Sequence, residues 1–394
     1  MELTLKQNQG LKIAVEKYKN KEPYVCVSGY AGSGKSTLIR FIIAALDVNP
    51  DTEVAYVAYT GKAANVLKSK GCPNPTTAHK LLYKARLMPD GKYRFMPLDR
   101  LETAYKVIVV DEISMLPQAM WIQLLKHKAF IIACGDPGQL PPVSADENNH
   151  VLDNPDIFLD EIMRQAQDSE IIRLSMDIRE GKPLSLLRGG EVQVIDKSQV
   201  VNGMYDWADQ ILCATNRTRV ALNNEIRKYY GRGEFPEDGD KVIALHNDWD
   251  TCTLAGTPLT NGQIGTLICP DKRQLYLPPC VSHNPIDILR SKFKTEEGED
   301  FECLDMDYKL FTTGDKALDG RQEYLLRKNK ATQFLVPKEF TYAYAITTHK
   351  SQGSEWDKVL IFEENFPFDR EEHKRWLYTA VTRASKKLVL VRKD

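Results

Sequence analysis

The chain has 394 residues, of which 42% are hydrophobic and 27% are charged, and its formal net charge at pH 7 is −1. A chain of this length is too long for one ordinary hydrophobic core, so we expect two or more domains. The near-neutral charge excludes a protein that binds nucleic acid through bulk positive charge, so any such partner must be held in a local groove.

Short apolar runs recur in the first part of the chain, each followed by glycine, a polar turn or a helical pattern. They lie at 24–28, 54–58, 107–110 and 130–134. A second set of runs lies at 211–215, 342–347, 359–362 and 388–391. β-rich runs that alternate with helical patterns predict parallel sheets with crossover helices. The sequence therefore predicts an α/β fold with two such units.

Two segments interrupt this alternation. The first contains RLMPDGKYRF, in which Pro-Asp-Gly between β-capable arms predicts a hairpin. The second has short β-like runs, many Gly and Pro, and little helical periodicity, which predicts a small inserted β-domain. The predicted boundaries are a first lobe at 1–75 and 103–165 with a hairpin insert at 76–102, and a second lobe at 166–239 and 337–394 with a β-insert at 240–336.

The cysteines and the chain start bear on cellular context. The eight cysteines form no Cys-x-x-Cys pair, and several lie in apolar runs, so buried reduced thiols are favoured over structural zinc. The start, MELTLKQNQG, lacks the apolar core of a signal peptide. No run reaches the roughly 18 apolar residues of a membrane span. We therefore expect a cytoplasmic protein with no membrane contact.

The stretch SGYAGSGKSTLIRF is the strongest signal in the chain. It satisfies G-x4-G-K-[ST] between an apolar run and a helix, which is the context that a phosphate-binding loop requires. Backbone N–H groups and the helix N-terminus would hold phosphate oxygens, Lys35 would reach the β- and γ-phosphates, and Ser36 would ligate Mg²⁺. The predicted nucleotide-binding set here is Gly29, Gly32, Ser33, Gly34, Lys35, Ser36 and Thr37.

Acidic and amide side chains follow two of the later runs. In VIVVDEISM, Asp111 would hold Mg²⁺ and Glu112 would polarise the attacking water. The alternative is an acidic pair favoured by a helix N-terminus. In FIIACGDPGQLPPV, Gln139 could sense the γ-phosphate, the alternative being an ordinary turn with an incidental Gln.

The order of the motifs GYAGSGKST, VDEISM, GDPGQLPPV, THKSQGSEW and LYTAVTRAS resembles that of superfamily 1 helicases. It is most similar to the RecD- and Dda-like subgroup, which moves 5′ to 3′ on single-stranded DNA. The resemblance runs from Gln7 to Arg383. It implies two RecA-like P-loop lobes with ATP between them, a small hairpin insert in the first lobe and a small β-barrel insert in the second.

The resemblance also implies nucleotide contacts outside the P-loop. Arg383, and Arg164 in LDEIMRQAQ, would close on the γ-phosphate. A helix-surface arginine is the alternative for Arg164. Gln7 would read the adenine edge through its amide, with Gln9 as the neighbouring alternative. Two further residues would lie towards the nucleotide, namely Gly353 and Glu355.

A set of residues that contact the DNA strand is implied by the same resemblance. It comprises Thr60, Lys62, Thr77, His79, Phe95, Thr347, Thr348 and His349. Hydroxyl and imidazole groups suit phosphate oxygens, and Phe95 in the hairpin could stack on the first base pair of a duplex. The alternatives are helix N-caps for the first-lobe threonines, a structural hydrogen bond for His349 and a small packed hairpin for the segment around Phe95.

The implied activity is that of an ATP-dependent helicase and translocase that uses Mg·ATP to move 5′ to 3′ on single-stranded DNA. Its expected substrates are single-stranded and forked duplex DNA, its expected state is a monomer, and single-strand-binding or replication proteins are candidate partners. Three alternatives stay open: an RNA-acting helicase, a nucleic-acid-stimulated ATPase that remodels without unwinding, and a small-molecule P-loop kinase. The segment 287–332 matches nothing specific.

Overall fold

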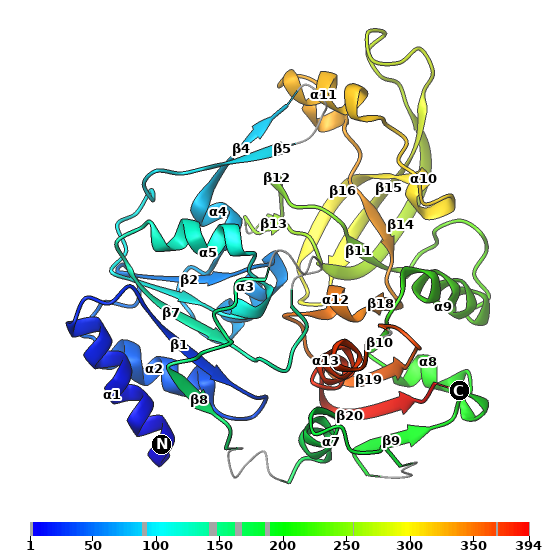
Figure 1. Cartoon of the computed structure of the whole chain (residues 1–394). Coiled ribbons are helices and arrows are strands. Elements are labelled where there is room, and N and C mark those ends of the chain that lie inside the picture. The colour runs from blue at the N-terminus through cyan, green and yellow to red at the C-terminus, as the bar shows by residue number, and fades with distance from the viewer. Residues whose placement is uncertain are drawn as a thin grey trace. The chain divides into compact units, whose positions relative to one another are not determined.

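A computed structural model describes residues 3–88, 93–141, 148–161, 168–185, 190–254, 256–367 and 369–393 of the chain (Figure 1). The chain forms two compact units. The first consists of Met1–Leu82, Pro97–Asn216 and Ile346–Asp394, and the second of Tyr83–Met96 and Arg217–Ala345. Each unit therefore combines segments that are far apart in the sequence.

The first sheet of the first unit has six strands in the order β3-β2-β6-β7-β1-β8. All five of its ladders are parallel. Every residue of β2, β6 and β7 is buried, as expected for strands covered on both faces. The strands are β1 (Tyr24–Gly29), β2 (Val54–Ala58), β3 (Thr76–Thr77), β6 (Val107–Val110), β7 (Phe130–Gly135) and β8 (Ile157–Leu159).

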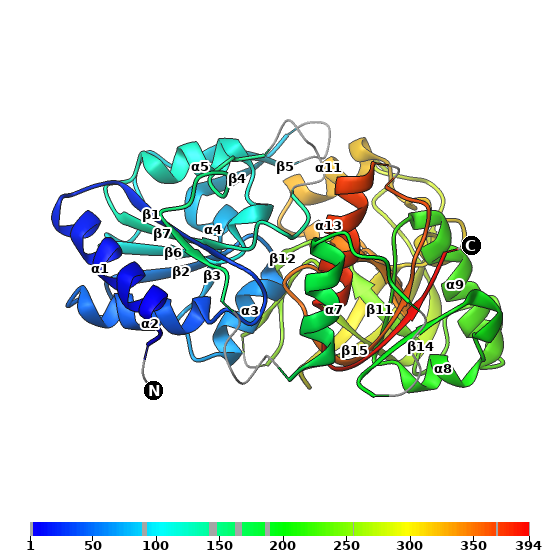
Figure 2. The same ribbon diagram turned by 60° about the horizontal axis from the view of Figure 1, so that its bottom comes forward.

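Helices cover this sheet. One apolar cluster joins the strands to three of the helices through Ala14, Leu38 and Ala64, which are all buried. In both views α1 and α2 lie side by side (Figures 1 and 2). The helical elements are α1 (Leu5–Lys19), α2 (Lys35–Ala45), α3 (Gly61–Ser69), α4 (Ala78–Leu82), η1 (Ile113–Met115) and α5 (Gln118–Leu125).

The second sheet has five strands in the order β18-β10-β19-β20-β9, and the ladders of β19 with β10 and β20, and of β20 with β9, are parallel. Its strands are β9 (Val192–Ile195), β10 (Gln210–Cys213), β18 (Ala345–Thr347), β19 (Trp356–Phe362) and β20 (Ala384–Val391). Its helices are α7 (Glu170–Arg179), η3 (Lys197–Gln199), α8 (Gly203–Trp207), α12 (Thr348–Ser351) and α13 (Arg370–Val381). Figure 2 shows α7 and α13 packed side by side.

The predicted α/β fold with parallel sheets is confirmed. We call the part of the chain around the first sheet the first lobe, and the part around the second sheet the second lobe.

The second unit contains an antiparallel sheet in the order β16-β15-β14-β11-β17. An isolated bridge between Met306 and Lys338 connects β16 to the segment just before β17. The interior is aromatic, with the Phe293 ring 5.0 Å from that of Phe340. The strands are β11 (Lys241–Ala244), β12 (Asp248–Cys252), β13 (Pro258–Leu259), β14 (Ile264–Leu275), β15 (Ile286–Thr295), β16 (Asp300–Asp307) and β17 (Phe340–Tyr342), and the helices are α9 (Asn216–Tyr229), α10 (Tyr308–Thr312), α11 (Gly320–Lys328) and η4 (Gln333–Leu335).

The boundaries of both predicted inserts need correction. The β-insert extends beyond 336, because β17 pairs with β11. The hairpin, formed by β4 (Tyr83–Leu87) and β5 (Tyr93–Pro97), is narrower than 76–102. Thr76 and Thr77 belong to the first sheet, where they pair with β2. The hairpin strands group with the second unit, where β4 contacts α11.

Two further observations concern the cysteines and the helices. Cys26 and Cys134 are buried in the first lobe, and burial raises the pKa of the Cys26 thiol to about 12. Four cysteines of the second unit are exposed, so the expectation of buried thiols is wrong for Cys252, Cys269, Cys280 and Cys303. Among the helices that the structure describes, none combines the length and the apolar character needed to cross a bilayer.

Candidate nucleotide-binding site

The loop between β1 and α2 has a shape that depends on glycine. Gly32 and Gly34 have φ angles of 76° and 81°, in the left-handed region that favours glycine. A Cβ on Gly29 would lie 2.7 Å from the carbonyl oxygen of Leu159 and 2.7 Å from Ser33 Oγ. Gly34 occupies the N-cap of α2 and has no side chain to cap it, so the first N–H groups of the helix are available to an anion.

The ammonium of Lys35 lies over this loop. Its Nζ donates to the carbonyl oxygens of Gly29, at 2.8 Å, and Tyr30, at 3.0 Å. Ser36 is exposed in the first turn of α2. The Oγ of Ser33 is buried and has no hydrogen-bond partner among the described residues. The loop thus presents a cation and polar groups at a helix N-terminus, which suits a polyphosphate.

Asp111 and Glu112 follow β6, at the same edge of the sheet as the end of β1. Burial raises the pKa of the Asp111 carboxyl, and the charge of Glu112 adds to that increase. Glu112 has a φ angle of 52° and donates its N–H to Asp111 Oδ1 at 3.1 Å. Its buried Oε2 has no hydrogen-bond partner among the described residues. Two crowded carboxylates of this kind fit a divalent cation, which would offset their repulsion.

The turn after β7 carries Asp136 and Gln139. Asp136 is buried and accepts hydrogen bonds from the Tyr378 hydroxyl, at 2.7 Å, and from the N–H of Gly138, at 2.9 Å. Gln139 is also buried, and its Oε1 has no hydrogen-bond partner within the part of the chain that the structure describes. An amide left in this state is available to a ligand.

Residues of the second lobe form hydrogen bonds with the P-loop and with the turn after β7. The N–H of Ala31 in the P-loop donates to the Tyr378 hydroxyl at 3.0 Å. The N–H of Leu140 donates to Thr379 Oγ1 at 2.9 Å, and its carbonyl oxygen accepts from Gln352 Nε2 at 3.0 Å. The P-loop and the turn after β7 are therefore each held by side chains from more than two hundred residues later in the chain.

The segment 347–356 also lies against α3 of the first lobe. Gly353 has a φ angle of 74°, and a Cβ at this position would lie 2.7 Å from Cβ of Ala63. Lys62 Nζ lies 4.7 Å from the centroid of the Trp356 ring. Glu355, which lies between Gly353 and Trp356 in the sequence, is exposed. A side chain at position 353 would therefore collide with α3 unless the backbone shifted.

The two arginines expected at the γ-phosphate differ in what the structure shows. Arg383 is buried, and its guanidinium donates to the carbonyl oxygens of Thr379, at 3.1 Å, and Ser354, at 3.2 Å, and to Thr382 Oγ1, at 3.2 Å. All three acceptors belong to the second lobe. Arg164 lies outside the described residues.

Gln7 lies beside the P-loop at the start of α1. Its Oε1 accepts from the N–H of Thr4 at 3.0 Å, which completes a capping box. Its Nε2 lies 3.4 Å from the carbonyl oxygen of Gly34. With only 1% of its surface exposed, Gln7 is packed against the loop that would hold the phosphates.

Of the first-lobe residues predicted to contact DNA, the two threonines form hydrogen bonds with nearby backbone groups. Thr60 caps α3 by accepting from the N–H of Ala63 at 3.2 Å, and Thr77 accepts from the N–H of Lys80 at 3.2 Å. Burial lowers the pKa of His79, so its imidazole is neutral at pH 7. In the hairpin, Phe95 has 48% of its surface exposed.

The second-lobe members of that set include one wrong prediction. Thr348 is fully buried and its hydroxyl donates to the carbonyl oxygen of Cys213 at 3.3 Å. Because α12 begins directly after β18, the Thr348 side chain points into the interior of the lobe. It is therefore not placed to contact a DNA strand. Thr347, at the N-cap position of α12, is also largely buried. His349 is half-buried, and burial lowers its pKa.

Three residues with clear positions in the site had no role in the sequence-based prediction. They are Asp136, Tyr378 and Thr379, which lie inside the motifs GDPGQLPPV and LYTAVTRAS. No local pattern in either motif indicates that this acid and this tyrosine form a hydrogen-bonded pair. The pairing itself depends on tertiary structure, since 242 residues separate the two partners.

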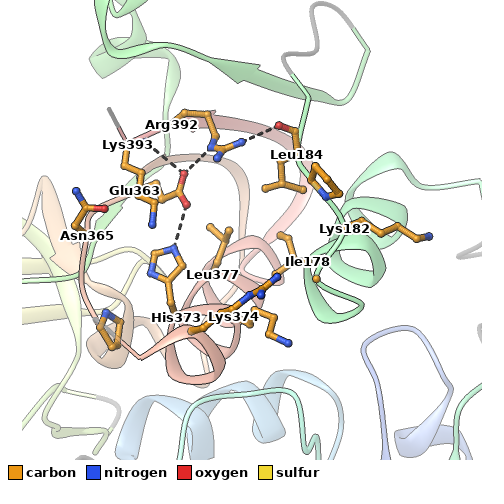
Figure 3. Close-up of a pocket in the computed structure, with 14 residues that line it drawn as sticks. Ile178, Lys182, Leu184, Glu363, Asn365, His373, Lys374, Leu377, Arg392 and Lys393 are labelled. Carbon is orange, nitrogen blue, oxygen red and sulfur yellow. Dashed lines mark hydrogen bonds and ion pairs between the residues drawn. The ribbon is translucent and has the colours of Figure 1, made fainter.

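A separate cavity of about 500 Å³ lies in the second lobe and contains none of the predicted site residues (Figure 3). Its wall includes Glu363, which accepts from His373 Nε2 at 3.0 Å, Arg392 Nε at 2.7 Å and the N–H of Lys393 at 3.3 Å. Arg392 also donates to the carbonyl oxygen of Leu184 at 2.8 Å. This network attaches the end of β20 to α13 and to the segment after α7.

Replacing Glu363 with glutamine should destabilise the fold by about 3 kcal/mol at pH 7, because Arg392 and His373 lose their carboxylate partner. Burial alone would raise the pKa of Glu363, but the hydrogen bond from His373 and the charge of Arg392 together lower it. A lowered carboxyl pKa stabilises the fold above the unfolded value of about 4.3. The advantage of the wild type should therefore shrink as pH falls below about 4.

Chemical denaturation at pH 7 and pH 3.5 would measure this difference. Glu371→Gln is a matched control, because Glu371 is exposed and pairs with Lys374 beside the same cavity. The control should cost less than about 1 kcal/mol. Equal losses in the two variants would contradict a stabilising role for Glu363.

Comparison with known proteins finds two matching family models and several relatives. Residues 4–197 match a family model described as "AAA domain", and residues 342–391 match one described as "UvrD-like helicase C-terminal domain". The ATP-dependent RecD2 DNA helicase of Deinococcus radiodurans is 26% identical over 390 residues, covering 91% of this chain and 46% of that protein. The ATP-dependent DNA helicase dda of Enterobacteria phage T4 is 28% identical over 300 residues, covering 68% of this chain and 67% of that protein.

Solved structures share the fold. The Pif1 helicase from Candida albicans has a TM-score of 0.56 at 19% identity, with 100% of this chain and 95% of that chain covered. The Pif1 helicase from Bacteroides, solved with ADP-AlF3 and ssDNA, has a TM-score of 0.53 at 17% identity, with 100% and 95% covered. The chain spans about half the length of the RecD2 relative, 46%.

Proposed function

We propose that the chain is a superfamily 1 helicase of the RecD- and Dda-like subgroup, and that it hydrolyses ATP to move 5′ to 3′ along single-stranded DNA and to unwind duplex DNA. The observation that carries this proposal is the contact of second-lobe side chains with both phosphate-side loops of the first lobe. Tyr378 binds Ala31 in one loop and Asp136 in the other. A ligand in the P-loop would therefore affect both lobes.

In this proposal ATP binds with its phosphates on the P-loop N–H groups and its adenine beside Gln7. Lys35 exchanges the carbonyl oxygens of Gly29 and Tyr30 for phosphate oxygens. Ser36 and Asp111 would hold Mg²⁺, which would neutralise charge on the β- and γ-phosphates when bound. With a cation present, Asp111 stays ionised despite its burial.

Hydrolysis needs a base and a group that stabilises charge. Glu112 orients and polarises the attacking water, and its buried Oε2 is available for this role. Gln139 senses the γ-phosphate from the turn after β7. Arg383 stabilises the charge that develops on the γ-phosphoryl group, with Arg164 in a similar role. A guanidinium has five N–H donors, and the bonds described above use three of those on Arg383.

Movement then follows from a change in the spacing of the two lobes. Each lobe holds the DNA backbone, through Thr60, Lys62, Thr77 and His79 in the first and Thr347 and His349 in the second. ATP favours the arrangement in which the second lobe contacts the P-loop, and loss of the γ-phosphate releases it. Phe95 stacks on the duplex end. A monomeric state and single-strand-binding or replication partners stay predictions.

Unwinding of tailed duplexes tests the proposal. A duplex with a 5′ single-stranded tail should be separated in the presence of Mg·ATP, and the same duplex with a 3′ tail should not. Strand separation is followed by fluorescence of a labelled strand, with ADP in place of ATP as the control. Because backbone contacts dominate, DNA binding should tolerate sequence changes and weaken with salt.

The other outcomes of this experiment separate the alternatives. Unwinding of the 3′-tailed duplex alone would contradict the proposed direction. Unwinding of neither, with DNA-stimulated ATP hydrolysis intact, would favour a remodelling ATPase. Unwinding that requires an RNA tail would favour an RNA helicase. Absence of any stimulation by single strands would leave a small-molecule kinase as the better hypothesis.

A further inference from the structure

The hydroxyl of Tyr378 is the point at which three segments of the site meet. It lies on α13 of the second lobe and is buried, with 2% of the residue exposed. The oxygen accepts from the N–H of Ala31 at 3.0 Å, and the O–H donates to Asp136 Oδ2 at 2.7 Å. Among the aromatic residues, only tyrosine can accept and donate at a single atom in this way.

The ring of Tyr378 is also fitted closely to the turn after β7. A Cβ on Gly138 would lie 3.0 Å from Cε1 and 3.2 Å from Cδ1 of the ring. Asp136 accepts from the N–H of Gly138 at 2.9 Å, and the N–H of Gln139 donates to the carbonyl oxygen of Asp136 at 3.2 Å. The position of Gln139 is therefore fixed through Asp136, which Tyr378 binds directly.

A second side chain supports the same part of the P-loop. The guanidinium carbon of Arg179, in the last turn of α7, lies 3.5 Å from the centroid of the Tyr30 ring. Because α7 packs against α13, two adjacent helices of the second lobe hold Tyr30 and Ala31. The P-loop backbone is thus positioned from outside its own lobe.

The charge on Asp136 makes this contact sensitive to ligand. Burial raises the pKa of Asp136, and the charge of Lys35 and the Tyr378 hydrogen bond oppose that increase. Lys35 is the residue that would turn to phosphate when ATP binds. A buried carboxylate that loses a donor carries a large desolvation cost, so separation of the lobes here is unfavourable unless Asp136 gains another partner.

We propose that Tyr378 is a positioning residue that aligns the P-loop with the turn carrying Gln139, so that ATP is hydrolysed efficiently only when the lobes are in this arrangement. The inference rests on the proposed function and extends it to a residue that would touch neither nucleotide nor DNA. It makes the Tyr378 hydroxyl the contact through which DNA-driven closure of the lobes accelerates hydrolysis.

The test compares Tyr378→Phe with wild-type full-length protein, using steady-state ATP hydrolysis with and without oligo(dT). The variant keeps the ring and loses both hydrogen bonds of the hydroxyl. The DNA-stimulated kcat should fall about ten- to a hundredfold, which corresponds to one hydrogen bond to a charged group. The KM for ATP should change less than about threefold, because the hydroxyl does not touch the nucleotide.

A double-mutant cycle separates positioning from general loss of structure. Asp136→Asn alone should produce a similar fall in kcat, and the double variant Asp136→Asn/Tyr378→Phe should be no slower than the slower single variant. Gly138→Ala provides an independent perturbation, because its methyl group would displace the ring without removing the hydroxyl. It should reproduce the loss of stimulation, and it keeps the test informative if Tyr378→Phe folds poorly.

Tyr344→Phe is the matched control. Tyr344 donates to Asp240 Oδ1 at 2.9 Å in the second unit, so the variant removes the same kind of bond away from the P-loop. It should lower thermal stability but leave stimulated kcat unchanged. Wild-type kcat in folded Tyr378→Phe or Gly138→Ala, or independent effects at 136 and 378, would overturn the inference alone. A wild-type protein without DNA-stimulated hydrolysis would overturn the proposed function and the inference with it.

Discussion

Replacing Lys35 with alanine should reduce ATP hydrolysis by more than about a thousandfold while leaving binding to single-stranded DNA measurable. In the structure the Lys35 ammonium lies on two carbonyl oxygens of the P-loop, at 2.8 and 3.0 Å, where the phosphates would bind. Its removal would take away the charge that we propose offsets the β- and γ-phosphates as the bond breaks. Phosphate release at saturating Mg·ATP measures the first effect, and fluorescence anisotropy of a labelled oligonucleotide measures the second.

Lys12→Ala is a suitable control, because Lys12 is an exposed lysine on α1 of the same lobe. It should leave both hydrolysis and DNA binding unchanged. Hydrolysis at the wild-type rate in Lys35→Ala would show that the P-loop is not the catalytic site. Complete loss of DNA binding would instead indicate that the variant had not folded, which circular dichroism can check.

Replacing Arg383 with alanine should lower kcat by about a thousandfold and change ATP affinity only a few-fold, because the charge that we propose it stabilises develops during phosphoryl transfer. The side chain is held in place by the carbonyl oxygens of Thr379 and Ser354. Single-turnover hydrolysis and equilibrium binding of a fluorescent ATP analogue measure the two quantities separately.

The lysine variant of Arg383 makes this test more specific. Arg383→Lys keeps the positive charge but loses the planar fork that can bind carbonyl oxygens and a phosphate together. It should recover only a small part of the lost rate. Loss of nucleotide binding with normal turnover at saturation would contradict the assigned role. A rate equal to the wild type in Arg383→Lys would show that only the charge matters.

The parts of this molecule that could be predicted from sequence are those encoded locally. The spacing from Gly29 to Ser36 defines a phosphate-binding loop wherever it follows a strand and opens a helix. Uninterrupted apolar runs such as VIVV at 107–110 mark strands that are covered on both faces. For these reasons the α/β fold and the two parallel sheets were predictable from local patterns, whereas the approach of the late segment to the first lobe was implied only by the family resemblance.

The parts that could not be predicted depend on tertiary contacts. Thr348 belongs to a polar cluster in sequence, but its position one residue after β18 turns it into the core. The strand at 340–342 joins the inserted sheet only because it pairs with residues a hundred positions earlier. The bond from Tyr378 to Asp136 likewise has no local pattern that could reveal it. Arg164 lies outside the described residues and stays a prediction.

Because the hairpin belongs to the second unit, the chain connects the two units at more than two places. The backbone passes between the units four times, at 82–83, 96–97, 216–217 and 345–346. The second unit is therefore joined to the first by four chain segments and not by a single linker. The last crossing falls within β18, so this short strand contributes residues to both units. The longest segment of the second unit therefore begins shortly after β10 and ends within β18, two strands of the second-lobe sheet.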